Sequence, residues 1–297
     1  MTTWVWIDGT VAPSSESRVG ATDRGLLLGD GVYETCQVVD GSPFALTRHL
    51  ARLRRSAALI DLALPWGDSH IRSACAEAVG AALIGPLRNN PGGDQDGGDQ
   101  DGGDTVGRLR ITVTGGVGPL GPDRGGAIPM LMVAAGPARI WAPTTDVVTV
   151  GWRLNEHSPL VGAKTTSYLE HLLALAEAHR RGADEAILAN TAGTLAEGTG
   201  SNVFLAVDGR LCTPSLSTGC LPGITRDLVM ELVPVEESDD LTLGHLRAAP
   251  EAFLTSSTRN VHPIARVDGQ LLPAVPGRLT RAATEGLATL QARTIDP

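Results

Sequence analysis

The sequence predicts a protein of two α+β domains, and three observations support this prediction. The chain has 297 residues, enough for about two globular domains. Asp-Gly pairs follow short apolar runs at several places, a pattern typical of antiparallel hairpins. Other segments repeat apolar residues at helical spacing. Both patterns occur in each half of the chain, so we expect antiparallel strands and helices in each domain.

Composition and charge exclude several classes of protein. Hydrophobic residues make up 42% of the chain, which supports a packed core. The net charge of −9 offers little attraction to phosphate backbones or anionic lipids, so we expect neither a nucleic-acid nor a membrane partner. No apolar run approaches the roughly 18 residues that span a bilayer, and the first residues do not resemble a signal peptide. We therefore expect a cytoplasmic protein.

The first domain is expected to begin with two hairpins. Apolar runs end at the Asp-Gly pairs 8–9 and 40–41, and type I′ turns favour Asp-Gly because both central residues need a positive φ. From Leu46, apolar residues recur every three or four positions up to Ile60, which predicts an amphipathic helix. Arg52 falls about 100° from the centre of this stripe, at the edge of the expected core. A second helix is expected at 69–83, and strands at 4–8, 33–39, 108–114 and 129–134.

Two glycine-rich segments interrupt this pattern. Residues 90–104 repeat Asp and Gly with no apolar side chain after their proline, so we expect a disordered loop insertion. Calcium binding is an alternative, but the known calcium repeat needs a regularly placed apolar residue. The motif GVGPLG at 116–121 has the spacing of a dinucleotide-binding loop, but the prolines and glycines around it exclude the helix that such a site needs.

The run GPARIWAPTTD at 136–146 has the composition of an interdomain linker. We therefore place a small N-terminal α/β domain at 1–135 and a larger domain at 147–297. In the second domain, strands are expected at 185–189, 203–207 and 210–213, a hairpin at the Asp-Gly pair 268–269, and helices after Pro222-Gly223 and at 280–293.

A further helix is expected at 166–181. Ser167 and Glu170 have the spacing of a capping box, and Arg180-Arg181-Gly182 is typical of a helix C-terminus. The expected buried stripe consists of Leu169, Leu172, Leu173 and Ala176. Lys164 lies just before this helix.

Lys164 is the only lysine among 24 basic residues. Arginine stays protonated, whereas a lysine can lose its proton when buried and become an amine nucleophile. A single lysine in so arginine-rich a chain suggests a reactive amine. The alternative is that this lysine has no special role and is present by chance.

Three other features suit a phosphate-bearing cofactor. Ile224 and Thr225 follow Gly223 at an expected helix start, where free N–H groups and the helix dipole favour an anion. An ordinary N-cap at Thr225 is the alternative. Arg52 supplies a spare guanidinium, and Glu197 in LAEGTGSNVF supplies a carboxylate. Pyridoxal 5'-phosphate requires an amine, phosphate anchors and an acid beside its ring nitrogen, so this set favours that cofactor.

Four stretches of the chain resemble the class IV aminotransferase family, the fold type IV pyridoxal phosphate enzymes. They cover residues 22–57, 163–204, 213–232 and 253–264, in the family's order. The resemblance implies a small N-terminal α/β domain and a larger C-terminal pseudo-barrel domain that holds most of the cofactor. It also implies a homodimer with the active site at the interface.

The resemblance assigns roles to the cofactor residues. Lys164 matches the Schiff-base lysine and is the expected catalytic residue, and Glu197 matches the acid that faces the pyridine nitrogen. Arg52 matches the phosphate-binding arginine. Ile224 and Thr225 match the backbone and hydroxyl donors to the phosphate.

Five more residues receive roles in the same way. Ser257 matches a further phosphate or substrate contact, and Tyr168 matches a tyrosine that approaches the ring hydroxyl. Tyr33 matches a tyrosine on the substrate side, and Arg110 stands where branched-chain enzymes place a carboxylate-binding arginine. Thr258 is expected beside the substrate.

These roles imply a transaminase that moves an amino group between an amino acid and a 2-keto acid, with Lys164 as general base. The D-amino-acid type carries an arginine and a histidine where this chain has Leu120 and Pro122. Arg110 or Arg124 could bind a carboxylate instead, although Arg110 could equally form a plain strand salt bridge. We expect a preference for D-amino acids or (R)-amines. Aminodeoxychorismate lyase, which eliminates pyruvate, and a branched-chain L-amino acid transaminase are the alternatives.

A metal- or anion-binding module is the alternative from outside the enzymes. The seven histidines show no metal-ligand spacing, and the four cysteines form no CxxC pair. We therefore expect no metal site.

Overall fold

The computed structural model describes residues 2–84 and 106–297. The chain divides into two compact units. The first comprises Met1–Ile140, Ala163–Ser167 and Ile295–Pro297, and the second comprises Trp141–Gly162 and Tyr168–Thr294. Lys164 therefore belongs to the first unit, although the second half of the sequence carries it. The expected loop insertion at 90–104 lies outside the described residues.

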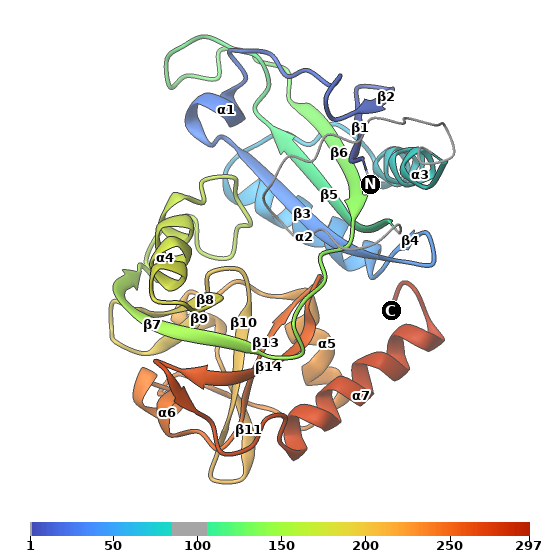
Figure 1. Ribbon diagram of the computed structural model, residues 1–297. Coiled ribbons are helices and arrows are strands. Elements are labelled where there is room, and N and C mark those ends of the chain that lie inside the picture. The colour runs from blue at the N-terminus through green and yellow to red at the C-terminus, as the bar shows by residue number, and fades with distance from the viewer. Residues whose placement is uncertain (1, 85–105) are drawn as a thin grey trace. The chain divides into compact units, whose positions relative to one another are not determined.

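In the first unit, the described strands form one six-stranded antiparallel sheet of order β2-β1-β6-β5-β3-β4 (Figure 1). The strands are β1 Trp4–Ile7, β2 Thr10–Pro13, β3 Gly31–Val39, β4 Ser42–Pro43, β5 Val106–Thr114 and β6 Met130–Pro137. Both predicted hairpins are confirmed, because Asp8, Gly9, Asp40 and Gly41 all have positive φ. The expected linker is shorter than 136–146, since Gly136 and Pro137 still belong to β6.

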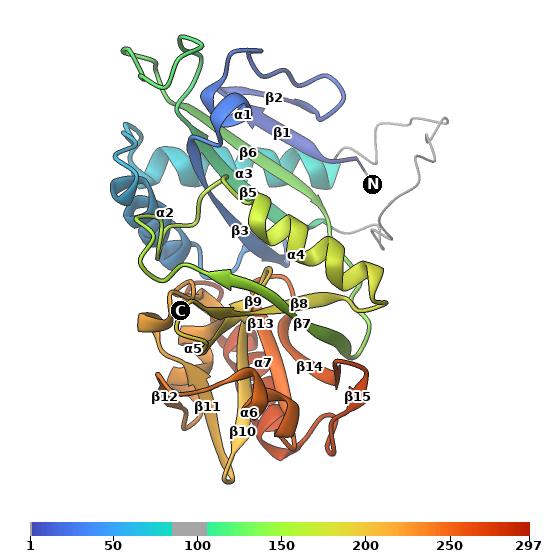
Figure 2. The ribbon, with the colours of Figure 1, turned by 90° about the vertical axis from the view of Figure 1, so that its left-hand side faces the viewer.

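Helices α2 (Leu46–Leu59) and α3 (Asp68–Ile84) pack against this sheet (Figure 2), and the short α1 (Arg24–Leu28) precedes β3. The predicted stripe of α2 is confirmed, since Leu46, Leu50 and Leu53 are buried in the core of the unit. Arg52 is only 3% exposed, so it lies inside the core rather than at its edge. In the described part of the chain, no helix begins directly after GVGPLG at 116–121, as predicted.

In the second unit, the described strands form a nine-stranded mixed sheet of order β12-β11-β10-β13-β14-β7-β8-β9, with β15 paired to β14. β7 runs parallel to both β8 and β14, whereas β10 is antiparallel to β11 and β13. The strands are β7 Thr145–Leu154, β8 Glu185–Asn190, β9 Leu195–Gly198, β10 Asn202–Val207, β11 Arg210–Pro214, β12 Glu236–Ser238, β13 Ala252–Ser256, β14 Asn260–Val267 and β15 Gln270–Leu271.

The helices of the second unit are α4 Leu169–Arg180, α5 Ile224–Leu232, α6 Leu243–Ala248 and α7 Arg278–Arg293. Helix α4 covers β7 and β8, and α5 and α7 lie side by side against β13 and β14 (Figure 1). The main core gathers apolar side chains from β8, β10, β13 and α6, including Ile187, Val203, Leu254 and Leu246. Both units thus combine helices with a largely antiparallel sheet, which confirms the predicted α+β class.

Helix α4 differs from the prediction in two ways. It begins at Leu169, and Ser167 does not cap it, because the Ser167 hydroxyl donates to the carbonyl of Gly29 (3.1 Å). The capping-box prediction is therefore wrong. The predicted leucine stripe is also wrong, because α4 buries the small side chains Ala174 and Ala178 against β7 and β8. The leucines remain exposed: Leu169 by 68%, Leu172 by 53% and Leu173 by 55%.

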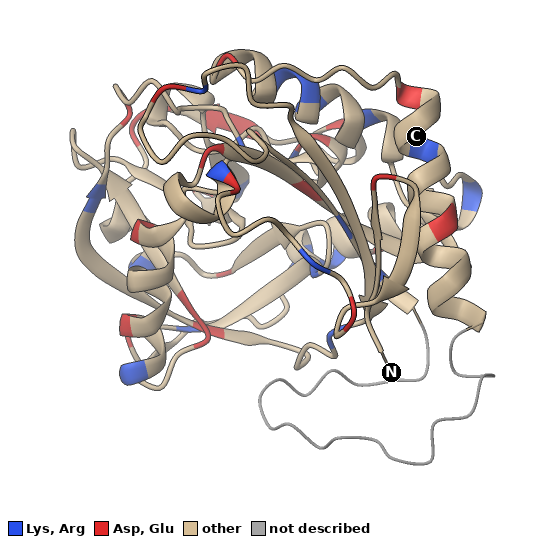
Figure 3. Cartoon of the chain, turned by 90° about the horizontal axis from the view of Figure 1, so that it is seen from above, with Lys and Arg blue, Asp and Glu red and all other residues tan. Residues whose placement is uncertain are grey.

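Acidic and basic residues are interspersed over both units (Figure 3). Within the part of the chain that the structure describes, no helix is both long and apolar enough to cross a membrane.

Candidate active site

Lys164 lies in a short segment that pairs beside the start of β3. The backbone N–H of Tyr33 donates to the carbonyl of Lys164 (3.0 Å), and the N–H of Lys164 donates to the hydroxyl of Ser56 (3.0 Å). The N–H of Thr166 donates to the carbonyl of Gly31 (2.9 Å). The backbone of Lys164 is therefore fixed on both sides, while its amine stays half-buried rather than enclosed.

The predicted substrate residue Tyr33 contacts both this amine and Arg110, a second predicted substrate residue. Lys164 Nζ lies 4.5 Å from the centroid of the Tyr33 ring, and the guanidinium carbon of Arg110 lies 3.7 Å from the same centroid. Arg110 Nε also donates to the hydroxyl of Thr112 (3.2 Å). The structure thus brings Lys164, Tyr33 and Arg110 into one cluster, joined by cation–π contacts to the tyrosine ring.

Arg52 is held by a carboxylate that the sequence analysis missed. Glu34 on β3 accepts from Arg52 Nε (2.8 Å) and Nη2 (2.6 Å), and its second oxygen also meets His49 Nδ1 (2.6 Å). All three side chains are buried. Nothing in the sequence identifies Glu34 as the partner of Arg52, because the two residues belong to different elements.

The charges of this cluster follow from burial and pairing. Burial alone would raise the pKa of Glu34, but the charge of Arg52 and hydrogen bonds from Arg52 and His49 outweigh it and lower that pKa to about 2. Burial lowers the pKa of His49, and the charges of Arg52 and Lys164 lower it further, against the opposing effect of Glu34. Glu34 is therefore ionised and can only accept, so the neutral His49 carries its proton on Nδ1.

Arg124 does not serve as a free carboxylate-binding group. Its guanidinium donates twice to Asp30 (2.7 and 3.0 Å) and once to the carbonyl of Ile60 (3.0 Å). The hydrogen bond from Arg124 lowers the pKa of Asp30, against the opposing effect of burial. Asp30 also pairs with the buried Arg24, which donates to the carbonyl of Pro122 (2.7 Å). These contacts fix the glycine-rich loop after β5, so Arg110 is the better candidate for a substrate carboxylate.

Glu197 lies on β9 in the second unit, with its carboxylate largely buried. One oxygen accepts from the backbone N–H of Leu221 (2.9 Å). The other lies 3.7 Å from His171 Nε2 on α4. His171 is a second residue that the sequence analysis missed as a functional candidate. The signal was its position seven residues after Lys164, on the helix that follows the lysine.

Tyr168 ends the segment that leads into α4. Its ring stacks on His171, with centroids 4.7 Å apart and an interplanar angle of 15°. Its hydroxyl donates to the carbonyl of Thr199, in the loop between β9 and β10. Tyr168, His171 and Glu197 therefore form one connected group.

The start of α5 has the features of an anion site. Gly223 is the N-cap, and no side chain caps the helix, so the alternative of an N-cap at Thr225 is wrong. Ile224 and Thr225 instead occupy the first turn, where backbone N–H groups have no partner within the helix. A Cβ on Gly223 would collide with the side-chain oxygen of Asn202, so this approach requires glycine.

Ser257 and Thr258 lie in the turn between β13 and β14. Both are half-buried, and the carbonyl of Thr258 accepts from Trp141 Nε1 (3.0 Å). The turn lies in the second unit together with Glu197 and the start of α5.

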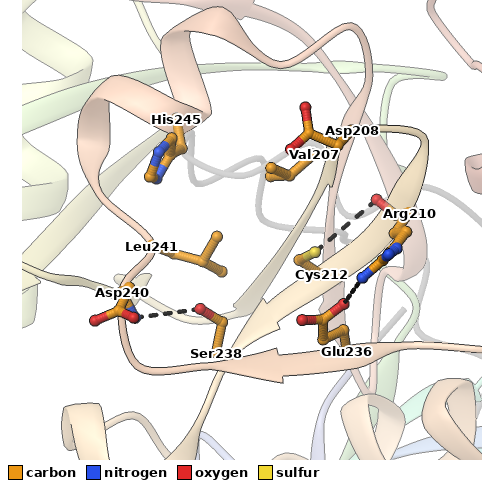
Figure 4. Close-up of a pocket in the computed structure, with 9 residues that line it drawn as sticks. All are labelled: Val207, Asp208, Arg210, Cys212, Glu236, Ser238, Asp240, Leu241 and His245. Atoms are coloured by element: carbon orange, nitrogen blue, oxygen red, sulfur yellow. Dashed lines mark hydrogen bonds and ion pairs between the residues drawn. The ribbon is translucent and has the colours of Figure 1, made fainter.

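One pocket of the second unit is unrelated to these residues. It encloses about 240 Å³ beside the β10–β11 hairpin and β12 (Figure 4). Three of its charged or titratable side chains have partners: Arg210 pairs with Glu236 (3.1 Å), and His245 Nδ1 accepts from the N–H of Thr242 (3.2 Å). None of the predicted site residues lines it.

Metal-ligating side chains do not cluster in the described part of the chain, and the cysteine thiols are buried. Among the described residues, no group of three or more His, Cys, Asp or Glu side chains is placed to bind a metal ion. All four cysteines are free and buried. Burial raises the pKa of Cys75 and of Cys220 to about 12, which keeps both as unreactive thiols.

Known proteins resemble this chain over most of its length. The family model described as amino-transferase class IV matches residues 31–267. D-alanine aminotransferase of Bacillus licheniformis is 30% identical over 93% of each chain. The branched-chain aminotransferase of Thermoproteus uzoniensis, solved with norvaline, is 28% identical with a TM-score of 0.83, covering 99% of this chain and 96% of that one.

A second solved structure shares the fold at lower identity. It is a branched-chain amino acid aminotransferase from T.th., solved in complex with N-(5'-phosphopyridoxyl)-L-glutamate. It has a TM-score of 0.80 and 24% identity, covering 99% of this chain and 96% of that one. Class IV aminotransferases use pyridoxal 5'-phosphate, and the structural neighbours have the fold type IV architecture. The family match spans well over half of the sequence. The chain belongs to the class IV aminotransferase family and is an enzyme of that class.

Proposed function

We propose that this enzyme is a pyridoxal 5'-phosphate-dependent transaminase acting on an α-amino acid and a 2-keto acid. The observation that carries the proposal is the cluster of Lys164, Tyr33 and Arg110, in which an amine and a guanidinium both contact one aromatic ring. Amino transfer needs a reactive amine, and a guanidinium recognises a carboxylate. An amine substrate without a carboxylate would leave Arg110 without this role, so we favour amino acids over (R)-amines.

The residues present suit the cofactor. Lys164 would carry it covalently, and the uncapped N–H groups of Ile224 and Thr225 would bind its phosphate, with Arg52 and Ser257 as further anchors. Glu197 would face the ring nitrogen, and Tyr168 the ring hydroxyl. When bound, the cofactor supplies a conjugated ring that accepts the electrons released at the substrate α-carbon.

The protein's own contribution is positioning and proton transfer. Lys164 would remove the α-proton as general base and return a proton to complete the transfer. Its fixed backbone keeps the amine beside Tyr33 throughout. The N–H of Leu221 and the ring of His171 hold the Glu197 carboxylate in place. The carboxylate therefore does not need to move during the reaction.

The preferred substrate is a D-amino acid. The similarity to D-alanine aminotransferase of Bacillus licheniformis supports this choice. A branched-chain L-amino acid is the second candidate, supported by the similarity to the Thermoproteus uzoniensis enzyme and by Arg110 beside Tyr33.

A visible spectrum of the purified protein tests the proposal. D-alanine should bleach the absorption band of the lysine-bound cofactor, and a keto acid should restore it. Bleaching by L-leucine alone would identify the branched-chain type instead. A band that responds to neither amino acid would point to aminodeoxychorismate as the substrate, and absence of any band after adding the cofactor would contradict the proposal.

Lys164→Arg gives a second test. Arginine keeps the positive charge but cannot act as the amine nucleophile, so the band should disappear and the rate should fall at least about 10³-fold. Full activity in this variant would overturn the assignment of Lys164.

We also propose that the enzyme is a homodimer. The exposed leucines of α4 form an apolar strip on a helix that already buries its alanines, and such strips mark interaction surfaces. Leu172→Lys should shift the protein to monomer in size-exclusion chromatography with multi-angle light scattering. Leu59→Lys, at an equally exposed leucine of α2, is the matched control and should leave the mass unchanged.

A further inference from the structure

A second buried carboxylate lies in the second unit, and none of the proposed steps uses it. Glu185, the first residue of β8, is 0% exposed. One of its oxygens accepts from the N–H of Gly200 (2.8 Å) and from the hydroxyl of Ser201 (2.7 Å). The other oxygen forms an ion pair with Arg259. A buried charge is tolerated only when it is paired, so all three contacts matter for the local structure.

The first two contacts fix the loop between β9 and β10. This loop follows Glu197, and the carbonyl of Thr199 within it accepts from the hydroxyl of Tyr168. A Cβ on Gly198 would lie 2.5 Å from the carboxylate of Glu185. Glycine at this position therefore allows the backbone of the loop to approach the buried acid closely. Glu185 therefore supports the loop that follows the acid proposed to face the ring nitrogen.

The third contact fixes the turn that carries Ser257 and Thr258. Arg259 follows these residues directly, and its guanidinium carbon lies 4.0 Å from the centroid of the Trp141 ring. Trp141 in turn donates to the carbonyl of Thr258 (3.0 Å). Arg259 is thus held between a carboxylate and an aromatic ring, and the turn is held with it.

We propose that Glu185 is a positioning residue that sets both cofactor loops, at 198–201 and 257–259, from one buried carboxylate. The inference rests on the proposed function of these loops. Glu185 touches neither substrate nor reacting atoms in this scheme. It acts through the backbone N–H of Gly200 and the side chain of Arg259, so its loss loosens two binding elements together.

The chain offers a closely matched control. Glu251 is also a buried carboxylate that accepts from backbone N–H groups and a hydroxyl, at the start of α7. It also lies against a glycine, Gly277. It supports a helix rather than a cofactor loop, so Glu251→Gln reports the general effect of neutralising a buried acid.

The test compares the affinity of the apoenzyme for pyridoxal 5'-phosphate in three proteins. Glu185→Gln should weaken binding about tenfold or more relative to wild type, as expected when a charged hydrogen-bonding group is lost. Glu251→Gln should stay within about threefold. Hydrogen exchange of the apoenzymes should show faster exchange in peptides containing 198–201 and 257–259 in Glu185→Gln only.

Equal loss of affinity in both variants would overturn the proposal, as would unchanged exchange in the two loops of Glu185→Gln. If Glu185→Gln does not fold, Arg259→Met takes its place, since methionine can still pack on Trp141 but cannot pair with Glu185. Faster exchange should then appear in 257–259, and normal exchange there would contradict the proposal. Failure of wild type to bind the cofactor would refute the proposed function, while the exchange data would still decide the role of Glu185.

Discussion

The two units hold their expected cofactor-binding groups in different ways. In the first unit, Arg52 depends on a buried ion pair with Glu34, inside the core between helix and sheet. In the second unit, the expected phosphate donors are backbone N–H groups at the start of α5, and Glu197 accepts from a backbone N–H. A side-chain ion pair depends on charge, whereas a helix terminus depends on the path of the backbone. We therefore expect Arg52 to be sensitive to the loss of its partner's charge and the start of α5 to be sensitive to replacement of Gly223.

Glu34→Ala should have the largest effect on stability. It leaves Arg52 as a buried charge without its main partner, and breaking a buried pair from one side costs about 3–5 kcal/mol. Urea unfolding monitored by circular dichroism measures this loss.

An exposed ion pair between α2 and the start of α3 is the control. Arg54 pairs with Asp68 (2.5 Å), but both side chains are well exposed to solvent, and such pairs contribute about 0–1 kcal/mol. Asp68→Ala should therefore change the free energy of unfolding by no more than this. Similar losses for Glu34→Ala and Asp68→Ala would show that burial does not distinguish the two pairs.

Gly223→Ala should have the next largest effect, and it tests the second unit. The new Cβ would collide with Asn202, and such overpacking typically costs about 1–3 kcal/mol. It should also displace the first turn of α5 and weaken binding of pyridoxal 5'-phosphate. Gly151→Ala, on β7 with no atom within 4 Å of the added Cβ, should leave both stability and affinity nearly unchanged. An unchanged affinity in Gly223→Ala would exclude α5 as the phosphate site.

Local features of both units could be predicted from the sequence. The Asp-Gly turns were predicted correctly because two adjacent residues determine the backbone conformation. The buried stripe of α2 was predicted correctly because the residues that repeat at helical spacing are the ones that are buried. Lys164 could be singled out because the chain has no other lysine.

Partners far apart in the sequence could not be predicted. Glu34 and Arg52 meet only because β3 and α2 pack together, and Glu185 and Arg259 are brought together by the sheet. The buried face of α4 was predicted wrongly, because its leucines are exposed and its alanines are buried. Periodicity identifies a face, but it does not say which face the neighbouring strands cover.

Acid should destabilise the first unit through His49. Because its pKa is lowered in the folded state, the unfolded chain binds more protons below about pH 6.5, and stability falls as pH drops from 7 to 5. One proton contributes at most about 1.4 kcal/mol per pH unit. The pKa of Glu34 is about 2 in the folded state instead of 4.5. Protonation of the unfolded chain at this residue therefore causes a second loss of stability as the pH falls from about 4.5 to about 2.

His49→Gln should reduce the slope of unfolding free energy against pH between 7 and 5, while a glutamine amide can still donate to Glu34. His262 in the second unit also has a pKa lowered by burial, so His262→Gln should reduce the slope further. A slope unaffected by His49→Gln would mean that His49 does not gain a proton on unfolding in this range.

His171→Asn should have the smallest effect and gives the sharpest test of the comparison. Glu197 has two supports, the N–H of Leu221 at 2.9 Å and the ring of His171 at 3.7 Å. If backbone groups dominate in the second unit, removing the imidazole should change the free energy of unfolding by less than about 0.5 kcal/mol. Affinity for pyridoxal 5'-phosphate should then fall less than about fivefold, whereas Glu197→Gln should lower it much further. A loss beyond tenfold in His171→Asn would show that Glu197, like Arg52, depends on a side-chain partner, and the distinction between the two units would fail.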